Sequence, residues 1–188
     1  MEQRKCDLRL KLYSGSLQMI KLPLLVGLLM TMNNVNSGMA VVHSPVRSAA
    51  AVMTYNEARF VELTNKERVQ RGLSHLEVDP LLVEIARAHS KEMSDKHYFS
   101  HHSPTPGIET PLDRYLASVT WRPSWALVGE NLFYCSIVDV DRGHTAFMNS
   151  PTHKSNVIEP RYDHIGVGIY VDARGEFWVT EMFLTKKD

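Results

Sequence analysis

Residues 164–184 read HIGVGIYVDARGEFWVTEMFL, and this stretch decides the fold. Residues 164–171 and 176–184 have the composition of β-strands, and the turn-forming sequence Asp-Ala-Arg-Gly separates them. Gly175 suits the left-handed backbone position of a hairpin loop. We therefore expect two antiparallel strands joined by a short turn.

Apolar side chains occupy both faces of the second strand. One face carries Phe177, Val179, Glu181 and Phe183, and the other carries Trp178, Thr180, Met182 and Leu184. A strand with apolar residues on both faces is covered on both sides in the folded protein. Residues 127–135 are a third candidate strand.

Helices are expected before and between these strands. The first begins at the capping box of residues 54–57 and is stopped by Gly72. The second begins at Asp79-Pro80, with Asp79 as the cap. Two further helices are expected at residues 110–118 and 139–149. Helices combined with an antiparallel hairpin predict an α+β layered domain.

Length, composition and charge narrow the class of protein. The chain has 188 residues, with 44% hydrophobic and 22% charged residues, as in one globular domain. After residue 40 there are 16 basic and 19 acidic residues, and no basic patch. Nucleic acid is therefore not an expected partner.

The N-terminal region has the architecture of a secretory signal peptide. Residues 22–32 form an apolar run of 11 residues, shorter than the roughly 20 that a membrane span needs. Basic residues precede this run, and small residues at 38 and 40 allow cleavage after Ala40. We predict a signal peptide over 1–40, with Met19 as an alternative start, and a linker over 41–53. The alternative is an uncleaved anchor; with cleavage, the protein is secreted, extracellular or periplasmic, and has no stable transmembrane span.

Three titratable residues in the second half stand in short, distinctive contexts. They are His101 in a Ser/Pro loop, Glu130 after Gly129, and His153 in a Ser-Pro loop that follows the fourth helix. Two imidazoles and a carboxylate are the ingredients of a divalent-metal site or of general acid–base chemistry. We expect His101, rather than the adjacent His102, to face inward.

Two further titratable residues lie on apolar faces. His89 belongs to the buried stripe of the second helix, where a hydrogen-bonded core histidine is favoured. Glu181 has apolar neighbours on its strand face, so its carboxylate needs a partner or a raised pKa. It either lies in a cleft with the histidines or reaches solvent at an edge.

Several segments, read in order, resemble one family. They lie at residues 65–73, 86–93, 99–114, 129–132, 147–153, 164–168 and 178–183. Together they resemble the bacterial branch of the CAP superfamily, also called the SCP/PR-1-like or allergen V5/Tpx-1-related domain. The resemblance covers residues 57–184, and we expect the domain to span residues 54–188.

The resemblance implies a fold and a site. The fold is a three-layer α-β-α sandwich, with a small antiparallel sheet between helices. Many members have a cleft with two histidines and two glutamates that can bind a divalent cation such as zinc. His101, Glu130 and His153 match three of these ligands by motif. The helix segment 147–150, where many eukaryotic members carry the second glutamate, has no carboxylate here.

Two classes of function follow from the resemblance. The first is a secreted ligand-binding module of the cell envelope, with a cell-wall, lipid or protein partner and no turnover. The second is a metal-assisted hydrolase, in which His101 and His153 hold the ion and Glu130 polarises the attacking water. The chain has no His-Glu-x-x-His or Gly-x-Ser-x-Gly motif, so we favour binding.

Overall fold

The computed structural model describes residues 52–187. The elements, in order, are α1 (Tyr55–Val69), β1 (Glu77–Val78), α2 (Pro80–Asp95), α3 (Pro111–Ser118), β2 (Trp125–Cys135), α4 (Val140–Asn149), α5 (Pro151–Val157), β3 (His164–Val171) and β4 (Phe177–Lys187). The predicted signal peptide (1–40) and most of the predicted linker (41–53) lie outside the described residues.

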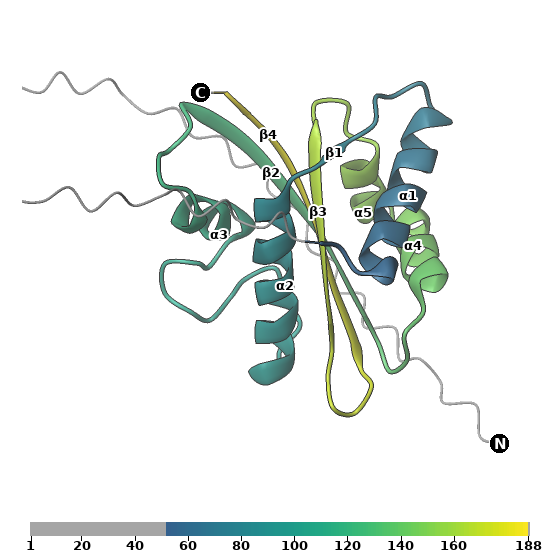
Figure 1. Ribbon diagram of the computed structural model, residues 1–188, viewed down its shortest axis with the longest axis vertical. Coiled ribbons are helices and arrows are strands. Elements are labelled where there is room, and N and C mark those ends of the chain that lie inside the picture. The colour runs from purple at the N-terminus through teal and green to yellow at the C-terminus, as the bar shows by residue number, and fades with distance from the viewer. Residues whose placement is uncertain (1–51, 188) are drawn as a thin grey trace, which may run out of the picture.

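The elements form three layers, and the expected α+β sandwich is confirmed. The strand order of the sheet is β1-β3-β4-β2. Helices α2 and α3 lie on one face of the sheet, and α1, α4 and α5 lie on the other (Figure 1). The sheet is mixed rather than wholly antiparallel, because the two-residue strand β1 pairs parallel to β3. Among residues 52–187, no helix is long and apolar enough to cross a bilayer.

The hairpin of β3 and β4 forms the centre of the sheet, as predicted. Gly175 adopts a φ of 79°, and its N–H donates to the carbonyl oxygen of Asp172 at 2.9 Å. Both faces of β4 are buried against helices. Gly166 and Gly168 of β3 allow the backbone of α2 to approach closely, since a Cβ at Gly168 would lie 2.0 Å from the backbone nitrogen of Arg87.

Helix starts follow local sequence signals. Thr54 and Glu57 form the predicted capping box of α1, and Thr110 and Asp113 form a second one at α3. Asp79 caps α2 by accepting from the N–H of Leu81. These contacts satisfy N–H groups that have no partner inside the helix.

Two apolar clusters hold the layers together. One lies between the sheet and α1, α4 and α5, and contains the stacked or edge-on rings of Phe60, Phe133, Phe147 and Phe177. The other lies between the sheet and α2 and α3. The sheet is thus covered on both faces, and β2 remains its edge strand.

The structure corrects one element of the sequence analysis. His153 does not lie in a loop, because residues Pro151–Val157 form the helix α5. Pro151 occupies the first turn of α5, where its missing N–H costs no hydrogen bond. The Ser-Pro sequence therefore begins a new helix after α4.

Candidate functional site

The site is built on the Gly129-Glu130-Asn131 segment of the edge strand β2. Side chains alternate across a strand, so Glu130 faces α2 and α3 while Gly129 and Asn131 face the opposite layer. A Cβ at Gly129 would lie 2.2 Å from the hydroxyl oxygen of Tyr162, so any larger residue there would require the Tyr162 side chain to shift. The packing on the two faces of β2 therefore differs for each residue of this segment.

Both oxygens of the Glu130 carboxylate are engaged. Oε1 lies 2.8 Å from Nδ1 of His101, and Oε2 accepts from Nη2 of Arg114 at 2.5 Å. Although burial alone raises the pKa of Glu130, Arg114 and the nearby histidines lower it to about 2. The carboxylate is therefore ionised and can only accept hydrogen bonds, so Nδ1 of His101 carries the proton.

Arg114 is the residue of the site that the sequence analysis missed as a functional partner. It lies on α3 and is 4% exposed. Besides Glu130, it donates to the carbonyl oxygen of His101 at 3.2 Å, and to those of Ile108 and Glu109. Arg114 thus fixes both the carboxylate and the backbone of the loop that carries His101.

His101 rather than His102 faces inward, as expected. The His101 side chain is 11% exposed and contacts Glu130, whereas His102 is exposed. Since Nδ1 is taken by Glu130, a ligand or metal at this histidine meets Nε2. A ligating histidine typically donates its other ring N–H to a carboxylate in this way.

A second layer of hydrogen bonds supports the same loop. The predicted core histidine His89 is 1% exposed, and its Nε2 lies 3.1 Å from the carbonyl oxygen of Ser100. Burial is the main reason why the pKa of His89 falls to about 4, so this ring is neutral near pH 7. Glu92 accepts from the hydroxyls of Tyr98 and Ser103. Helix α2 thereby holds both sides of the loop.

His153 approaches the same edge of the sheet from α5. It is 3% exposed, and its ring centroid lies 5.5 Å from that of Phe147. Its Nδ1 is buried and makes no hydrogen bond within residues 52–187. Burial and, to a smaller extent, the charge of nearby His101 lower the pKa of His153 to about 4. The ring is therefore a neutral imidazole near pH 7.

Glu181 is fully buried on the other face of the sheet. It pairs with Asn131 across β2 and β4, so its side chain points away from the face that carries Glu130. Its carboxylate accepts from Oγ1 of Thr64 at 2.6 Å and from Nδ2 of Asn131 at 3.0 Å. Burial raises the pKa of Glu181 to about 7. The solvent-reaching alternative is excluded, and the hydrogen bonds of the carboxylate go to a threonine and an asparagine.

Asn131 connects this buried carboxylate to the helix of His153. Its Nδ2 also donates to the carbonyl oxygen of His153 at 3.2 Å, and its Oδ1 accepts from Asn156. Asn156 donates in addition to the carbonyl oxygen of Glu130 at 3.0 Å. These bonds fasten α5 to β2 and so place His153 beside the edge strand.

An aromatic pocket opens next to the His101 loop. Its volume is about 460 Å³, and its lining residues are His97, Tyr98, Phe99, Tyr134, Arg174, Glu176 and Trp178. Tyr134 stands four residues after Glu130 on β2, and Phe99 stands two residues before His101. Aromatic walls with few charged groups are typical of small-ligand sites.

The donor set fits a divalent cation only through its two imidazoles. No group of three His, Cys, Asp or Glu side chains within residues 52–187 is arranged to hold a metal ion. Glu130 already accepts from His101 and Arg114 with both oxygens. An ion at this edge of the sheet would therefore meet the imidazoles of His101 and His153. Imidazole nitrogens are suitable ligands for zinc.

The same geometry makes Glu130 a poor general base. A base works best when its pKa lies near the operating pH. The pKa of Glu130 is lowered to about 2, and Arg114 and His101 already occupy both oxygens. Its chemistry is therefore that of an anchor that orients His101.

Comparisons with known proteins place the chain in a family. The family model described as "CAP: Cysteine-rich secretory protein family" matches residues 61–183. "Uncharacterized protein YkwD" of Bacillus subtilis is 39% identical over 139 residues, covering 74% of this chain. "Uncharacterized membrane protein YlbC" of the same organism is 33% identical over 119 residues, covering 63% of this chain. The matches cover 51% of YkwD and 32% of YlbC, so the chain spans about half or less of these relatives.

Solved structures agree with this assignment. An extracellular SCP-domain protein of Bacillus anthracis matches with a TM-score of 0.58 and 29% identity, over 71% of this chain and 40% of that chain. An outer surface protein of Borrelia burgdorferi shares the fold, with a TM-score of 0.62 and 21% identity, over 72% of this chain and 97% of that chain. The chain therefore belongs to the cysteine-rich secretory protein (CAP) family.

Proposed function

We propose that this CAP domain is an extracytoplasmic ligand-binding module whose site lies at the edge of β2, around His101, Glu130 and His153. In this proposal, an N-terminal signal peptide directs export, and the domain binds a component of the cell envelope. The description of the Bacillus anthracis relative as extracellular supports the location. The partner class is a cell-wall polymer, a lipid or a protein.

One arrangement carries the proposal. Arg114 and Glu130 form a buried ion pair that holds His101 by Nδ1, and His153 keeps a buried Nδ1 with no hydrogen bond within residues 52–187. Such a costly polar arrangement is not needed to fill a core, because apolar residues would pack there at lower cost. Two imidazoles at the edge of the sheet are a ready-made polar contact for a ligand.

The same two imidazoles would hold a divalent cation such as Zn²⁺. When bound, the ion would supply a positive charge and an open coordination position for an anionic or carbonyl group of a ligand. Glu130 orients His101 and keeps its Nδ1 protonated, so Nε2 is the atom presented. Two protein ligands predict weaker binding than the three or four of closed structural sites.

The metal-assisted hydrolase is the less favoured alternative. It requires Glu130 to take a proton, and a carboxylate with a pKa of about 2 does so weakly near pH 7. Binding is therefore the function that the geometry supports best.

Calorimetric titration of Zn²⁺ into the untagged protein tests the cation. We expect heat of binding in the wild type and its loss in His101→Ala and in His153→Ala. His102→Ala is the matched control, because His102 neighbours His101 but is exposed. Equal heats in all four proteins would remove the assigned site.

Retention on isolated cell-wall material and on immobilised cell-envelope proteins tests the ligand. We expect retention of the wild type and a loss of at least tenfold in His101→Ala, with unchanged thermal unfolding. If the protein is retained on neither and on no lipid, the binding function is wrong.

A further inference from the structure

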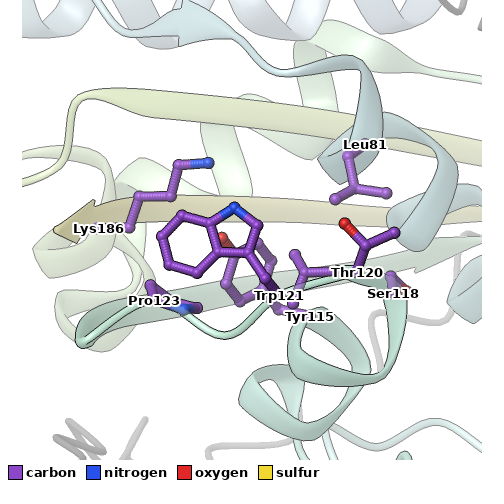
Figure 2. A pocket seen from close by; sticks show the side chains of 8 residues that line it. Leu81, Tyr115, Ser118, Thr120, Trp121, Pro123 and Lys186 are labelled. Atoms are coloured by element: carbon purple, nitrogen blue, oxygen red, sulfur yellow. The ribbon is translucent and has the colours of Figure 1, made fainter. Parts of the chain in front are cut away.

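A second recess lies at the end of the sheet where β4 finishes. Lys186 in its lining pairs with Ala126, which stands four residues before Glu130 on β2, about 14 Å along the strand. The volume of the recess is about 260 Å³, and the loop between α3 and β2 forms one wall. Figure 2 shows the Trp121 indole between Lys186 and Thr120, which also line the recess.

The recess is amphipathic. Leu81, Val119 and Pro123 supply apolar walls, while Thr120 and Lys186 supply a hydroxyl and an ammonium group. The indole of Trp121 is 55% exposed, so a large aromatic ring stands in solvent at the rim. An exposed indole beside an ammonium group fits a ligand that has both an apolar and an anionic part.

Three basic residues lie at or beside the recess, and one carboxylate, that of Asp163, contacts the same end of β4 by accepting from Thr185 at 2.7 Å. Arg122, Lys186 and Lys187 are all exposed. None of the ion pairs in the described part of the chain includes them, whereas Arg59, Arg87, Arg161 and Arg174 each contact a carboxylate. This local excess contrasts with the acidic balance of the chain after residue 40.

Two contacts fix Lys187 in place. Lys187 pairs with Trp125 across β2 and β4, and its Nζ lies 6.0 Å from the centroid of that indole. The hydroxyl of Ser124 donates to the carbonyl oxygen of Lys187 at 3.1 Å. Side chains alternate along a strand, so Trp125 and Lys187 lie on the face of the sheet opposite to Lys186. Two tryptophans and three cations thus lie at one end of the domain, on both faces of the sheet, and we call this the tryptophan–lysine end (Trp121, Arg122, Trp125, Lys186, Lys187).

We propose that the tryptophan–lysine end docks on the surface of an anionic phospholipid bilayer, with a headgroup phosphate in the recess beside Lys186. Tryptophan favours the membrane–water interface, where its ring lies at headgroup level. Basic residues near an anionic surface are attracted to it within a Debye length. The apolar walls accept the first carbons of the lipid, and the indole lies beside them.

This surface is distinct from the histidine site. It uses a different end of β2 and none of the residues His101, Glu130 or His153. Membrane docking by the tryptophan–lysine end is therefore independent of ligand binding at the histidine site, and the two can be tested separately. A domain attached by this end would keep the aromatic pocket and the histidine site available to a partner.

The test needs a local readout, because residues 22–32 are apolar and could hold the full chain on any vesicle. Full-length protein is mixed with phosphatidylcholine vesicles, with or without phosphatidylglycerol, whose acyl chains are brominated to quench indole fluorescence. We expect quenching on the anionic vesicles alone. Trp121→Phe should remove most of it, although Trp125 and Trp178 remain.

The gain in affinity on going from phosphatidylcholine vesicles to anionic vesicles supplies the second measurement, because the apolar run of residues 22–32 contributes to both. Each lysine near an anionic surface contributes to the free energy of binding, so Lys186→Gln and Lys187→Gln should each weaken binding about fivefold. The double variant should weaken binding about 25-fold. Lys66→Gln and Tyr55→Ala are the controls, because both residues are exposed on α1, which covers the face of the sheet opposite to the recess (Figure 1). Neither control should change the affinity by more than about twofold.

Two results would overturn the proposal. One is equal vesicle affinity of the wild type and the double lysine variant, with no quenching of Trp121. The other is lysine-dependent binding to soluble poly(glycerol phosphate) without binding to vesicles, which would assign the surface to an anionic polymer. Zn²⁺ titration of the double variant separates the sites, since loss of vesicle binding should leave the heats unchanged.

Discussion

Arg114 and Glu130 form an ion pair that is buried at both ends. Nη2 of Arg114 lies 2.5 Å from Oε2 of Glu130, and the two side chains are 4% and 1% exposed. The pair joins α3 to the edge strand β2, and through the other carboxylate oxygen it reaches His101. His101 is therefore held by the buried carboxylate of Glu130, whose charge would be unfavourable without Arg114.

Removing the arginine should destabilise the domain strongly. Arg114→Leu leaves the Glu130 carboxylate buried without its guanidinium partner, and it frees the carbonyl oxygens of the His101 loop. Breaking a buried pair by removing one partner costs about 3–5 kcal/mol in the free energy of unfolding. Urea unfolding at pH 7 measures this cost.

A double substitution distinguishes the pair from simple packing. Arg114→Leu combined with Glu130→Leu removes both charges, and we expect it to recover at least half of the lost stability. If the double variant loses as much free energy of unfolding as the two single variants together, the ion pair does not account for the loss of stability.

Glu181 should make stability fall as the pH rises through the neutral range. Its pKa is about 7 in the folded protein, above the ordinary value of 4.5, so the folded state holds a proton that the unfolded state releases. The stabilisation is complete below about pH 4.5 and is lost progressively up to about pH 7. A shift of this size corresponds to about 3 kcal/mol.

The measurement compares the wild type with Glu181→Gln at several pH values between 4.5 and 8. Taking the difference is necessary because His89 and His153, whose pKa values are lowered, change stability in the opposite direction over much of this range. We expect the advantage of the wild type to shrink with pH and to level off above about pH 7. A constant difference would mean that Glu181 stays ionised in the folded state.

Much of the fold was predictable because its signals are local. The capping boxes at Thr54 and Thr110 and the glycine of the β3–β4 turn each depend on residues within a few positions of one another. The apolar residues on both faces of β4 likewise predicted burial on both sides. Helix α5 was missed because seven residues starting at a proline show too little periodicity.

The site was only partly predictable, because its partners come from distant segments. The motifs identified His101, Glu130 and His153, but Arg114 is 16 residues from Glu130 and looks like an ordinary helix surface charge. Similarly, Glu181 meets Thr64 across 117 residues, and sequence alone left open which face of the sheet it would serve. Only the three-dimensional arrangement shows that Glu130 and Glu181 lie on opposite faces.

The close packing of α2 on β3 yields a last prediction, about Gly168. A Cβ at this position would lie 2.0 Å from the backbone nitrogen of Arg87 and 2.2 Å from the carbonyl carbon of Ala86. These are backbone atoms of a helix and cannot rotate away, so Gly168→Ala must push α2 off the sheet. Overpacking of this kind costs about 3 kcal/mol or more in the free energy of unfolding.

Gly72→Ala is the matched control for Gly168→Ala. Gly72 has a φ of 73° but nothing within 4 Å of an added Cβ, so it tests backbone strain without a clash. Strain in the left-handed region costs about 1–2 kcal/mol. Denaturant unfolding should therefore rank Gly168→Ala below Gly72→Ala, and both below the wild type. Because α2 also carries His89 and Glu92, which hold the His101 loop, Gly168→Ala should in addition weaken Zn²⁺ binding at His101, whereas Gly72→Ala should not. If Gly168→Ala proves more stable than Gly72→Ala, α2 can move away from the sheet without cost.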